Sequence, residues 1–285
     1  MSYLRSRLIH IYDMKHLLTL LFALSILPVC AQDYGTLYKK GVELIENKEY
    51  TRAIPVLEQA LPLAGERGKF SILVNLAYSQ MMTGELEKAI DNYSRAHALR
   101  PWENSVLFQR SSAYMQLGRI DEAIKDCDRI IDAMPDNADA LVTRAQAYML
   151  KGEYKKTKDD LVKAITAEPG NTEARVGLVQ LYRKEKKYDE AMVLIGLMIE
   201  EHPDNATLYI VRSDIERELG QTELALMDVS KAIEIDPENP EFHTLQAILY
   251  EMCDKKPAAA RSRKKANALK LKKGPEQSNR TTGIF

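Results

Sequence analysis

Small and apolar residues recur along the chain with the spacing of one helical face, and the same arrangement returns every 34 residues. Within each unit these residues stand at i, i+4 and i+7, which places them on one side of a helix. The clearest row is rich in alanine: Ala53, Ala89, Ala123, Thr157, Ala191, Ala225 and Ala259. A fixed period of this length predicts a stack of helical units, each burying its apolar side against the next.

Proline and glycine mark the ends of the predicted helices. Five prolines follow one another at intervals of 34 residues: Pro101, Pro135, Pro169, Pro203 and Pro237. Proline cannot continue a helix, so one helix ends near each of them. Four glycines stand 17 residues before a proline, where a left-handed residue can end a helix: Gly84, Gly118, Gly152 and Gly220. Lys186 occupies that place in one unit, where we expect a loosened turn.

This layout resembles the tetratricopeptide repeat (TPR) family. The resemblance rests on a small residue at the eighth place of each unit, alanine at the twentieth, a small residue at the twenty-seventh and proline at the thirty-second. It implies an all-α fold, a right-handed α-solenoid of about seven helix–turn–helix repeats. We number the repeats 1 to 7: 34–67, 70–103, 104–137, 138–171, 172–205, 206–239 and a degenerate capping repeat at 240–273. The polar tail, 274–285, is predicted to be disordered.

The N-terminal residues have the layout of a secretory signal peptide. Lys15 and His16 precede an apolar run, 17–29, which is shorter than the roughly 20 residues that a membrane span needs. Val29 and Ala31 then occupy the −3 and −1 positions of a cleavage site before Gln32. We therefore predict a signal peptide at 1–31 and an exported, periplasmic protein.

Two alternatives stay open at this end of the chain. If translation starts at Met14, residues 1–13 are not part of the protein. Residues 27–30 resemble a bacterial lipobox, which would make the protein a lipoprotein anchored at Cys30, although Val29 is bulkier than the residue usual before the cysteine. The remaining cysteines, Cys127 and Cys253, fall in repeats too far apart for a disulfide, and we expect free thiols.

The charge is unevenly distributed, although the net charge of −1 implies no general attraction to nucleic acid. Residues 254–285 contain ten Lys/Arg against two Asp/Glu (+8), and residues 32–253 contain 27 against 38 (−11). The simpler interpretation is a solvated cap on the stack. The other is peripheral contact with an anionic membrane through six basic residues: Lys255, Lys256, Arg261, Arg263, Lys264 and Lys265.

Three repeats combine an arginine at the seventh place with an aspartate at the twenty-third. The pairs are Arg110 with Asp126, Arg144 with Asp160, and Arg212 with Asp228. Repeats that lack the arginine also lack the aspartate. We predict that each pair bridges the two helices of its own repeat, where a part-buried ion pair specifies register more than it adds stability.

No pattern in the sequence indicates an enzyme. His97, His202 and His243 each stand alone in a different repeat, without a companion at metal-ligand spacing. There is no glycine-rich phosphate loop, no paired Cys-x-x-Cys and no nucleophile elbow. We therefore predict no catalytic residue, no metal and no cofactor.

The TPR resemblance implies that a partner lies in a concave groove lined by the second, fifth, ninth, twelfth and thirteenth places of each first helix. The N-terminal part of this wall is apolar: Tyr38, Val42, Val74, Tyr78, Met81, Phe108, Met115 and Met149. The C-terminal part is polar: Gln146, Gln180, Arg183 and Arg217. Flexible methionines beside aromatic rings suit an adaptable apolar surface.

These features favour a non-enzymatic scaffold or adaptor that binds a peptide or partner protein in the groove. The alternative function is a membrane-peripheral factor of envelope assembly, held by a lipid on Cys30 or by the basic end. Neither interpretation identifies the partner or the oligomeric state.

Overall fold

The computed structural model describes residues 33–273. The predicted signal peptide, Cys30 of the lipobox-like segment and the predicted disordered tail lie outside these residues. The chain divides into two compact units, Met1–Ile72 and Leu73–Phe285, and the boundary falls within a helix.

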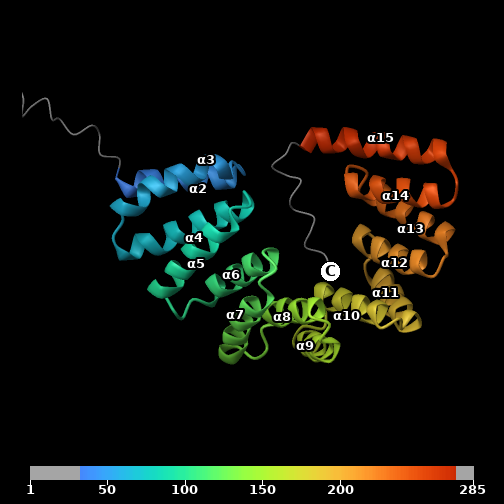
Figure 1. Ribbon diagram of the computed structural model, residues 1–285, viewed down its shortest axis with the longest axis horizontal. Helices are drawn as coiled ribbons and strands as arrows, with labels where there is room; N and C mark the ends of the chain where they lie inside the picture. Colours follow the sequence, from blue (N-terminus) through green and yellow to red (C-terminus); the bar gives the residue numbers. More distant parts are fainter. Residues whose placement is uncertain (1–32, 274–285) are drawn as a thin grey trace, which may run out of the picture. The chain divides into compact units, whose positions relative to one another are not determined.

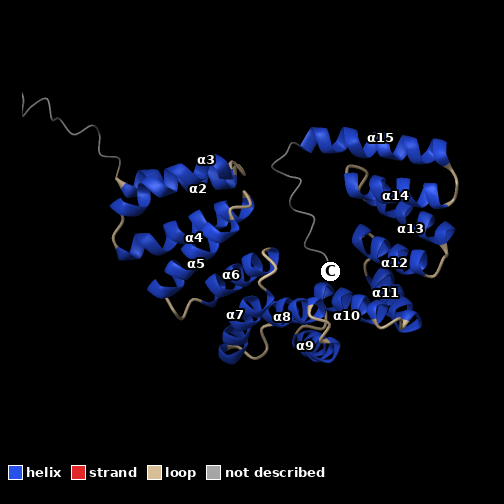
Figure 2. Ribbon diagram, viewed as in Figure 1, coloured by secondary structure: helices blue, strands red, loops and turns tan. Residues whose placement is uncertain are grey.

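The described residues form helices and turns, with no strand among them (Figure 2). The helices, labelled in Figure 1, are α2 (Tyr34–Glu46), α3 (Tyr50–Ala60), the short η1 (Leu61–Leu63), α4 (Glu66–Met82), α5 (Leu86–Leu99), α6 (Asn104–Gln116), α7 (Ile120–Ala133), α8 (Ala138–Leu150), α9 (Tyr154–Ala167), α10 (Thr172–Lys184), α11 (Tyr188–Glu201), α12 (Ala206–Glu218), α13 (Thr222–Ile235), α14 (Pro240–Met252) and α15 (Lys256–Lys273).

The first unit is a hairpin of α2 and α3, followed by η1 and the start of α4. The side chain of Asp33 accepts a hydrogen bond from the backbone N–H of Thr36 (3.0 Å) and caps α2. Gly41 lets the helices cross closely, because a Cβ on it would lie 2.5 Å from a methyl carbon of Leu57. Leu57 is fully buried, so this crossing forms the centre of the hairpin core.

The second unit is a succession of helical hairpins that makes the protein a right-handed α-solenoid. Each helix from α5 onward contacts the next one along the chain. The first helices of neighbouring repeats also contact one another, α6 with α8, α8 with α10, and α10 with α12. This order places the first helices together in one row, and their exposed faces form a shared surface.

The small residues of the periodic rows fill the space between these helices. Ala89, Ala123, Ala191 and Ala225 are fully buried, and Thr157 takes the same role in repeat 4. Larger apolar side chains such as Leu161 and Ile195 lie beside them and are also fully buried. Because the same places are small in every repeat, the helices of each hairpin pack at close range throughout.

Asparagines after four of the prolines cap the first helix of the next repeat. The side chains of Asn137 and Asn171 each accept a hydrogen bond from a backbone N–H three residues later, both at 2.8 Å. Those of Asn205 and Asn239 accept one from two residues later, both at 3.1 Å. The period therefore has a cause at the start of these four first helices as well as at the helix ends.

The turn inside repeat 5 is not loosened, which corrects the expectation for Lys186. Lys186 adopts a left-handed conformation with φ of 59°, close to that of Gly152 at 73°. The hydrogen bonds of the turn are also the same: Gly152 and Lys186 each donate to a carbonyl three residues back, both at 3.0 Å. The repeat frame imposes the glycine geometry on a lysine, at a conformational cost.

Both described cysteines are free thiols, as expected. Burial raises the pKa of the Cys127 thiol to about 12, so this group stays protonated and unreactive at neutral pH.

Candidate binding surface and polar ladder

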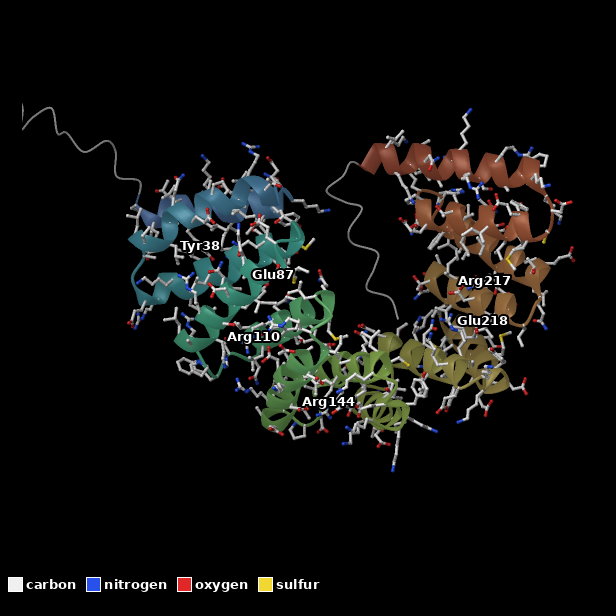
Figure 3. All side chains as sticks on the ribbon, viewed as in Figure 1. Tyr38, Glu87, Arg110, Arg144, Arg217 and Glu218 are labelled. Atoms are coloured by element: carbon white, nitrogen blue, oxygen red, sulfur yellow. The ribbon has the colours of Figure 1, made fainter. Side chains whose placement is uncertain are left out.

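The candidate groove residues are distributed over both units. Tyr38 and Val42 lie on α2, in the first unit. The others lie on α4, α6, α8, α10 and α12, in the second unit, and we call this second set the first-helix wall: Val74, Tyr78, Met81, Phe108, Met115, Gln146, Met149, Gln180, Arg183 and Arg217. Figure 3 labels Tyr38 of the first unit and Arg217 of the first-helix wall.

The apolar members of the first-helix wall are half-buried rather than enclosed in the core. Tyr78, Met81, Phe108, Met115 and Met149 each retain part of their surface in solvent. They come from α4, α6 and α8, and the last two of these helices contact each other directly. A partner's apolar side chains could therefore meet a succession of flexible and aromatic groups along the row.

The charged members of the wall are already paired within the protein. Arg183 on α10 reaches Asp214 on α12 at 3.3 Å and Glu218 at 3.6 Å. Arg217 reaches the same Asp214 at 3.2 Å. The sequence did not predict these pairs, because the places that they join have no charge pattern that recurs from repeat to repeat.

The two glutamines of the wall differ in their surroundings. Gln146 donates a hydrogen bond to Glu173 at 3.1 Å, across from α8 to α10. Gln180 is only 5% exposed, and its side-chain oxygen has no hydrogen-bond partner among the described residues. Gln180 is therefore a weaker candidate for contact with a partner than its half-buried neighbours.

The structure brings together all three arginine–aspartate pairs. Each arginine donates two parallel hydrogen bonds to its aspartate: 2.7 and 2.6 Å for Arg110 with Asp126, 2.8 and 2.7 Å for Arg144 with Asp160, and 2.6 and 2.7 Å for Arg212 with Asp228. The aspartates are buried and the arginines part-buried. Such two-pronged contacts fix orientation as well as supplying energy.

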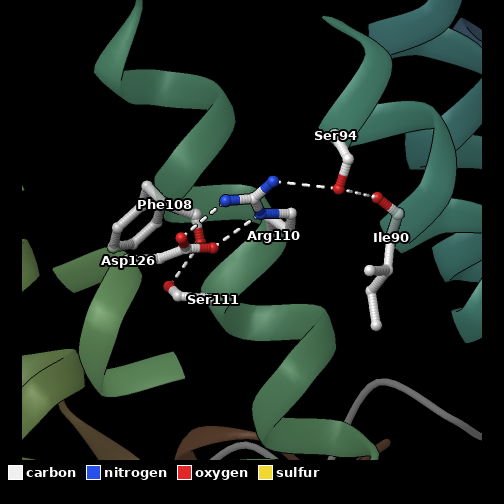
Figure 4. A network of polar contacts seen from close by, with 6 residues as sticks. All are labelled: Ile90, Ser94, Phe108, Arg110, Ser111 and Asp126. Carbon is white, nitrogen blue, oxygen red and sulfur yellow. Dashed lines mark hydrogen bonds and ion pairs between the residues drawn. The ribbon is translucent and has the colours of Figure 1, made fainter. Parts of the chain in front are cut away.

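Arg110 and Arg144 each have a further hydrogen-bond partner in the preceding repeat, which the sequence pattern did not predict. Arg110 also donates to the hydroxyl of Ser94 on α5 at 2.9 Å, and Ser94 donates to the backbone carbonyl of Ile90 at 2.7 Å (Figure 4). Arg144 likewise donates to Asp128 on α7 at 2.6 Å. Ser94 and Asp128 occupy the twenty-fifth place of their repeats. One arginine thus links three consecutive helices.

The same arrangement recurs without charge at the C-terminal end. Gln246 on α14 donates to Ser230 on α13 at 3.3 Å and accepts from Ser262 on α15 at 2.8 Å. We call these sixteen-residue links the polar ladder, since every member lies 16 residues from its partner. In the sequence, this spacing can be recognised only when the seventh place is compared with two others. These are the twenty-third place of its own repeat and the twenty-fifth place of the preceding repeat.

The polar ladder is incomplete in repeats 5 and 6. Repeat 5 has Leu178 and Leu194 in place of the ion pair, and Gly196 stands where Arg212 would need its acceptor in the preceding repeat. Glu216 replaces a residue that is tyrosine in repeats 3, 4, 5 and 7. This glutamate is 5% exposed, and burial, with the nearby charge of Asp228, raises its pKa to about 7.

Comparison with known proteins agrees with this architecture. Family models described as tetratricopeptide repeat match residues 114–159, 149–215 and 206–239. The crystal structure of a tetratricopeptide repeat protein from Parabacteroides merdae is similar over 84% of this chain and 93% of that chain, with a TM-score of 0.71 and 24% sequence identity. This chain is a tetratricopeptide repeat protein.

Two further solved structures are similar to this chain in fold at lower identity. A thermophilic TPR protein from Thermus thermophilus is 16% identical over 65% of this chain and 98% of that chain, with a TM-score of 0.57. One chain of the APC/C hetero-tetramer Cut9–Hcn1 is 16% identical in sequence, over 80% of this chain and 45% of that chain, with a TM-score of 0.60. No curated protein matches the chain. At these identities the likenesses show the fold alone.

Membership of the TPR family supports a general function as a protein–protein interaction scaffold, which is typically not enzymatic. Within residues 33–273 no group of three or more His, Cys, Asp or Glu side chains could hold a metal ion. His243 contacts the backbone carbonyl of Pro237 at 3.0 Å, and burial lowers the pKa of His97. A pocket of 410 Å³ lies at the turn 134–139 and contains no candidate residue.

The basic residues of this TPR protein's last helix lie on its exposed side. All six candidates for membrane contact are exposed. Arg263 pairs with Glu251 at 2.7 Å and Lys256 with Asp254 at 3.4 Å, whereas Lys264 and Lys265 have no ion pair in the described part of the chain. None of the described helices has the length and apolar character of a membrane span.

Proposed function

We propose that this TPR protein is a non-enzymatic scaffold that binds a peptide or partner protein along the first-helix wall. The observation that supports this most is the row of half-buried methionine and aromatic side chains on first helices that pack against one another. Side chains needed only for the core would be buried like Leu141 and Leu161, which are 1% and 0% exposed. Methionine adapts its shape to an apolar partner at little cost.

The two parts of the wall would contribute differently to binding. The apolar part supplies contact area for one side of a peptide or an amphipathic helix. At the other end, a partner's charge would have to share Arg183 or Arg217 with Asp214 and Glu218, which already neutralise them. The charged part therefore sets the direction of the partner more than the affinity.

The double variant Tyr78→Ala with Met81→Ala tests the proposal. Partners are first captured with the wild-type full chain from an envelope fraction and identified by mass spectrometry, and their binding to each variant is then measured. We expect the variant to lose at least tenfold in affinity while its helical content stays that of the wild type. The matched control changes an exposed pair on the outside of α5, Asp91→Ala with Arg95→Ala. Equal binding by both variants would reject the role of the first-helix wall.

We further propose that the protein is exported to the periplasm, on the support of the signal-like layout of residues 1–31. N-terminal sequencing of the mature protein tests this. A start at Gln32 supports the proposal, a blocked and lipid-modified Cys30 supports the lipoprotein alternative, and a start at Met1 or Met14 contradicts both.

The alternative function as a membrane-peripheral factor is favoured by one observation, the exposed lysines of α15. Co-sedimentation of the full chain with anionic phospholipid vesicles separates the two functions. Vesicle binding that disappears in the variant Lys264→Glu with Lys265→Glu would support the membrane alternative, and no binding would leave the scaffold function alone.

A further inference from the structure

The outer faces of the second helices are not alike. At the twenty-second and twenty-sixth places, α5, α7 and α9 have charged pairs: Asp91 and Arg95, Lys125 and Arg129, Asp159 and Lys163. In α11 the same places hold Val193 and Leu197, which are 65% and 50% exposed. The next helix, α13, exposes Leu224 and Met227 at 47% and 68%. We call Val193 and Leu197 the apolar strip of α11. Neighbouring apolar side chains on a solvent-exposed surface mark a contact site.

Acidic residues border the apolar strip at both ends of α11. Asp189 and Glu190 precede Val193, and Glu200 follows Leu197 on the same side of the helix. All three are exposed. Asp189 and Glu200 are eleven residues apart, or about three turns and roughly 16 Å along the axis. The α11 face therefore presents acid, two apolar side chains and acid in that order.

The outer face of α15 has the opposite charge with the same spacing. Its buried side consists of Ala259, Ser262, Ala266 and Leu269. Its exposed side has Arg261, Lys264 and Lys265, then Leu271, which is 85% exposed, and Lys272. Arg261 and Lys272 are also eleven residues apart, again roughly 16 Å. Lys272 lies 3.7 Å from Glu238, and the other basic residues of this face have no ion pair within the described residues.

We propose that the outer face of α15 in one copy of this protein docks on the apolar strip and flanking acids of α11 in a second copy. Arg261 and Lys272 would meet the acids at the two ends, and the aliphatic stems of Lys264 and Lys265 would lie over Val193 and Leu197 between them. Two α11 faces cannot pair with each other, because their acidic ends would repel. The contact is therefore heterologous, and each added copy leaves one surface of each kind open.

A lipid surface is a poorer match for the same face of α15. A helix that lies in a membrane interface turns a broad apolar side outward. Of the two leucines of α15, Leu269 is buried in the repeat and Leu271 alone is exposed. Anionic lipid would also leave the apolar strip of α11 uncovered, whereas a second copy covers both surfaces at once.

Two full-chain variants test this proposal together. One disrupts the strip with Val193→Asp and Leu197→Asp, and the other disrupts α15 with Lys264→Glu and Lys265→Glu. Both sets of side chains are exposed, so we expect both variants to fold. In sedimentation velocity we expect the mass of the wild type to rise with concentration and to fall as salt is added. Each variant alone should stay a monomer at all concentrations.

The mixture of the two variants gives the sharpest result. Each retains the surface that the other lacks, so equal amounts should form a dimer and nothing larger. The control variant Lys125→Glu with Arg129→Glu, at the equivalent places of α7, should associate like the wild type. A monomeric wild type at all concentrations would overturn the proposal. So would an α15 variant that still associates by itself, or a wild type that binds anionic vesicles through α15 and remains a monomer.

Discussion

Repeats 3 and 4 are held together differently from repeats 5 and 6. In the first two, Arg110 and Arg144 each link three consecutive helices through buried or half-buried polar groups. In repeat 5 leucines replace the pair, and in repeat 6 Arg212 hydrogen-bonds only to Asp228 within the described residues. The helices nevertheless follow the same frame. The comparison shows that the small residues and the turns define this fold, and that the polar ladder is an addition to it.

The outer surfaces differ along the same division. Where the polar ladder is complete, the second helices expose charged residues at the twenty-second and twenty-sixth places. Where it is interrupted, α11 exposes Val193 and Leu197. Repeat 5 thus lacks the buried ion pair and exposes apolar side chains on α11, which is expected of a segment that contacts another molecule.

The largest effect is expected when the polar ladder is broken on one side. Asp160→Ala leaves the guanidinium of Arg144 nearly buried with only Asp128, so unfolding in urea should show a loss of about 3–5 kcal/mol. Arg144→Leu with Asp160→Leu copies repeat 5 and should cost clearly less than the single change. A double variant less stable than Asp160→Ala would mean that the ion pair itself stabilises repeat 4, which the comparison with repeat 5 does not predict.

Stability of the wild type should fall as pH rises from about 5 to 8 because of Glu216. Its pKa in the folded state, about 7, is above its ordinary value of 4.5. The folded protein therefore retains a proton that the unfolded chain has lost, and this contribution disappears as pH rises through 7. Glu216→Gln keeps a neutral side chain beside Asp228 and Arg212.

We expect this variant to be more stable than the wild type by about 1–3 kcal/mol at pH 8 and to differ little at pH 4. Glu216→Tyr, which restores the residue of the other repeats, should show the same flat pH profile. A wild type and a Glu216→Gln variant with parallel profiles would contradict the assignment.

Lys186→Gly should stabilise the protein by about 0.5–1 kcal/mol, since glycine adopts the observed left-handed conformation without strain. Lys184→Gly is the matched control, because Lys184 is in the last turn of α10 and should lose helix propensity when replaced. Thermal unfolding of the two variants measures the contrast. Destabilisation by both would mean that the turn of repeat 5 does not need a left-handed residue.

A similarly small effect is expected from completing the polar ladder in repeat 6. Gly196 is inside α11, and a Cβ there would meet nothing within 4 Å. Gly196→Ser should add about 0.5–1.5 kcal/mol through helix propensity and a hydrogen bond from Arg212, as Ser94 accepts one from Arg110. Gly196→Ala supplies the propensity alone. If Gly196→Ser is at least as stable as Gly196→Ala, the hydrogen bond from Arg212 forms. A Gly196→Ser variant that is clearly less stable than Gly196→Ala would refute it.

Much of the fold could be predicted from the sequence, because proline, glycine and alanine at fixed places act locally on each helix and turn. The arginine–aspartate pairs were visible for the same reason, as two residue types that occur together in one repeat. The role of Ser94 and Asp128 was not, since serine and aspartate at an exposed-looking place have no distinguishing pattern. Lys186 was misjudged because the turn is fixed by its neighbours more than by its own preference.

The candidate binding surface was less accessible to sequence reasoning. The places of the wall came from the family resemblance, and the sequence could not show that Arg183 is shared between Asp214 and Glu218. Nor could it show that Gln180 is buried whereas Met115 and Met149 are only half-buried, since burial depends on the neighbouring helices. The apolar strip, by contrast, can be recognised once the outer places of all repeats are compared.

Site-specific photo-crosslinking in cells tests the central claim most directly. A photoreactive phenylalanine analogue replaces Phe108 on the first-helix wall, and the same analogue replaces Lys125 on the outside of α7 in a matched chain. We expect the analogue at position 108 to crosslink to a defined protein partner, and we expect no such crosslink from position 125. Crosslinks at position 125 with none at position 108 would contradict it.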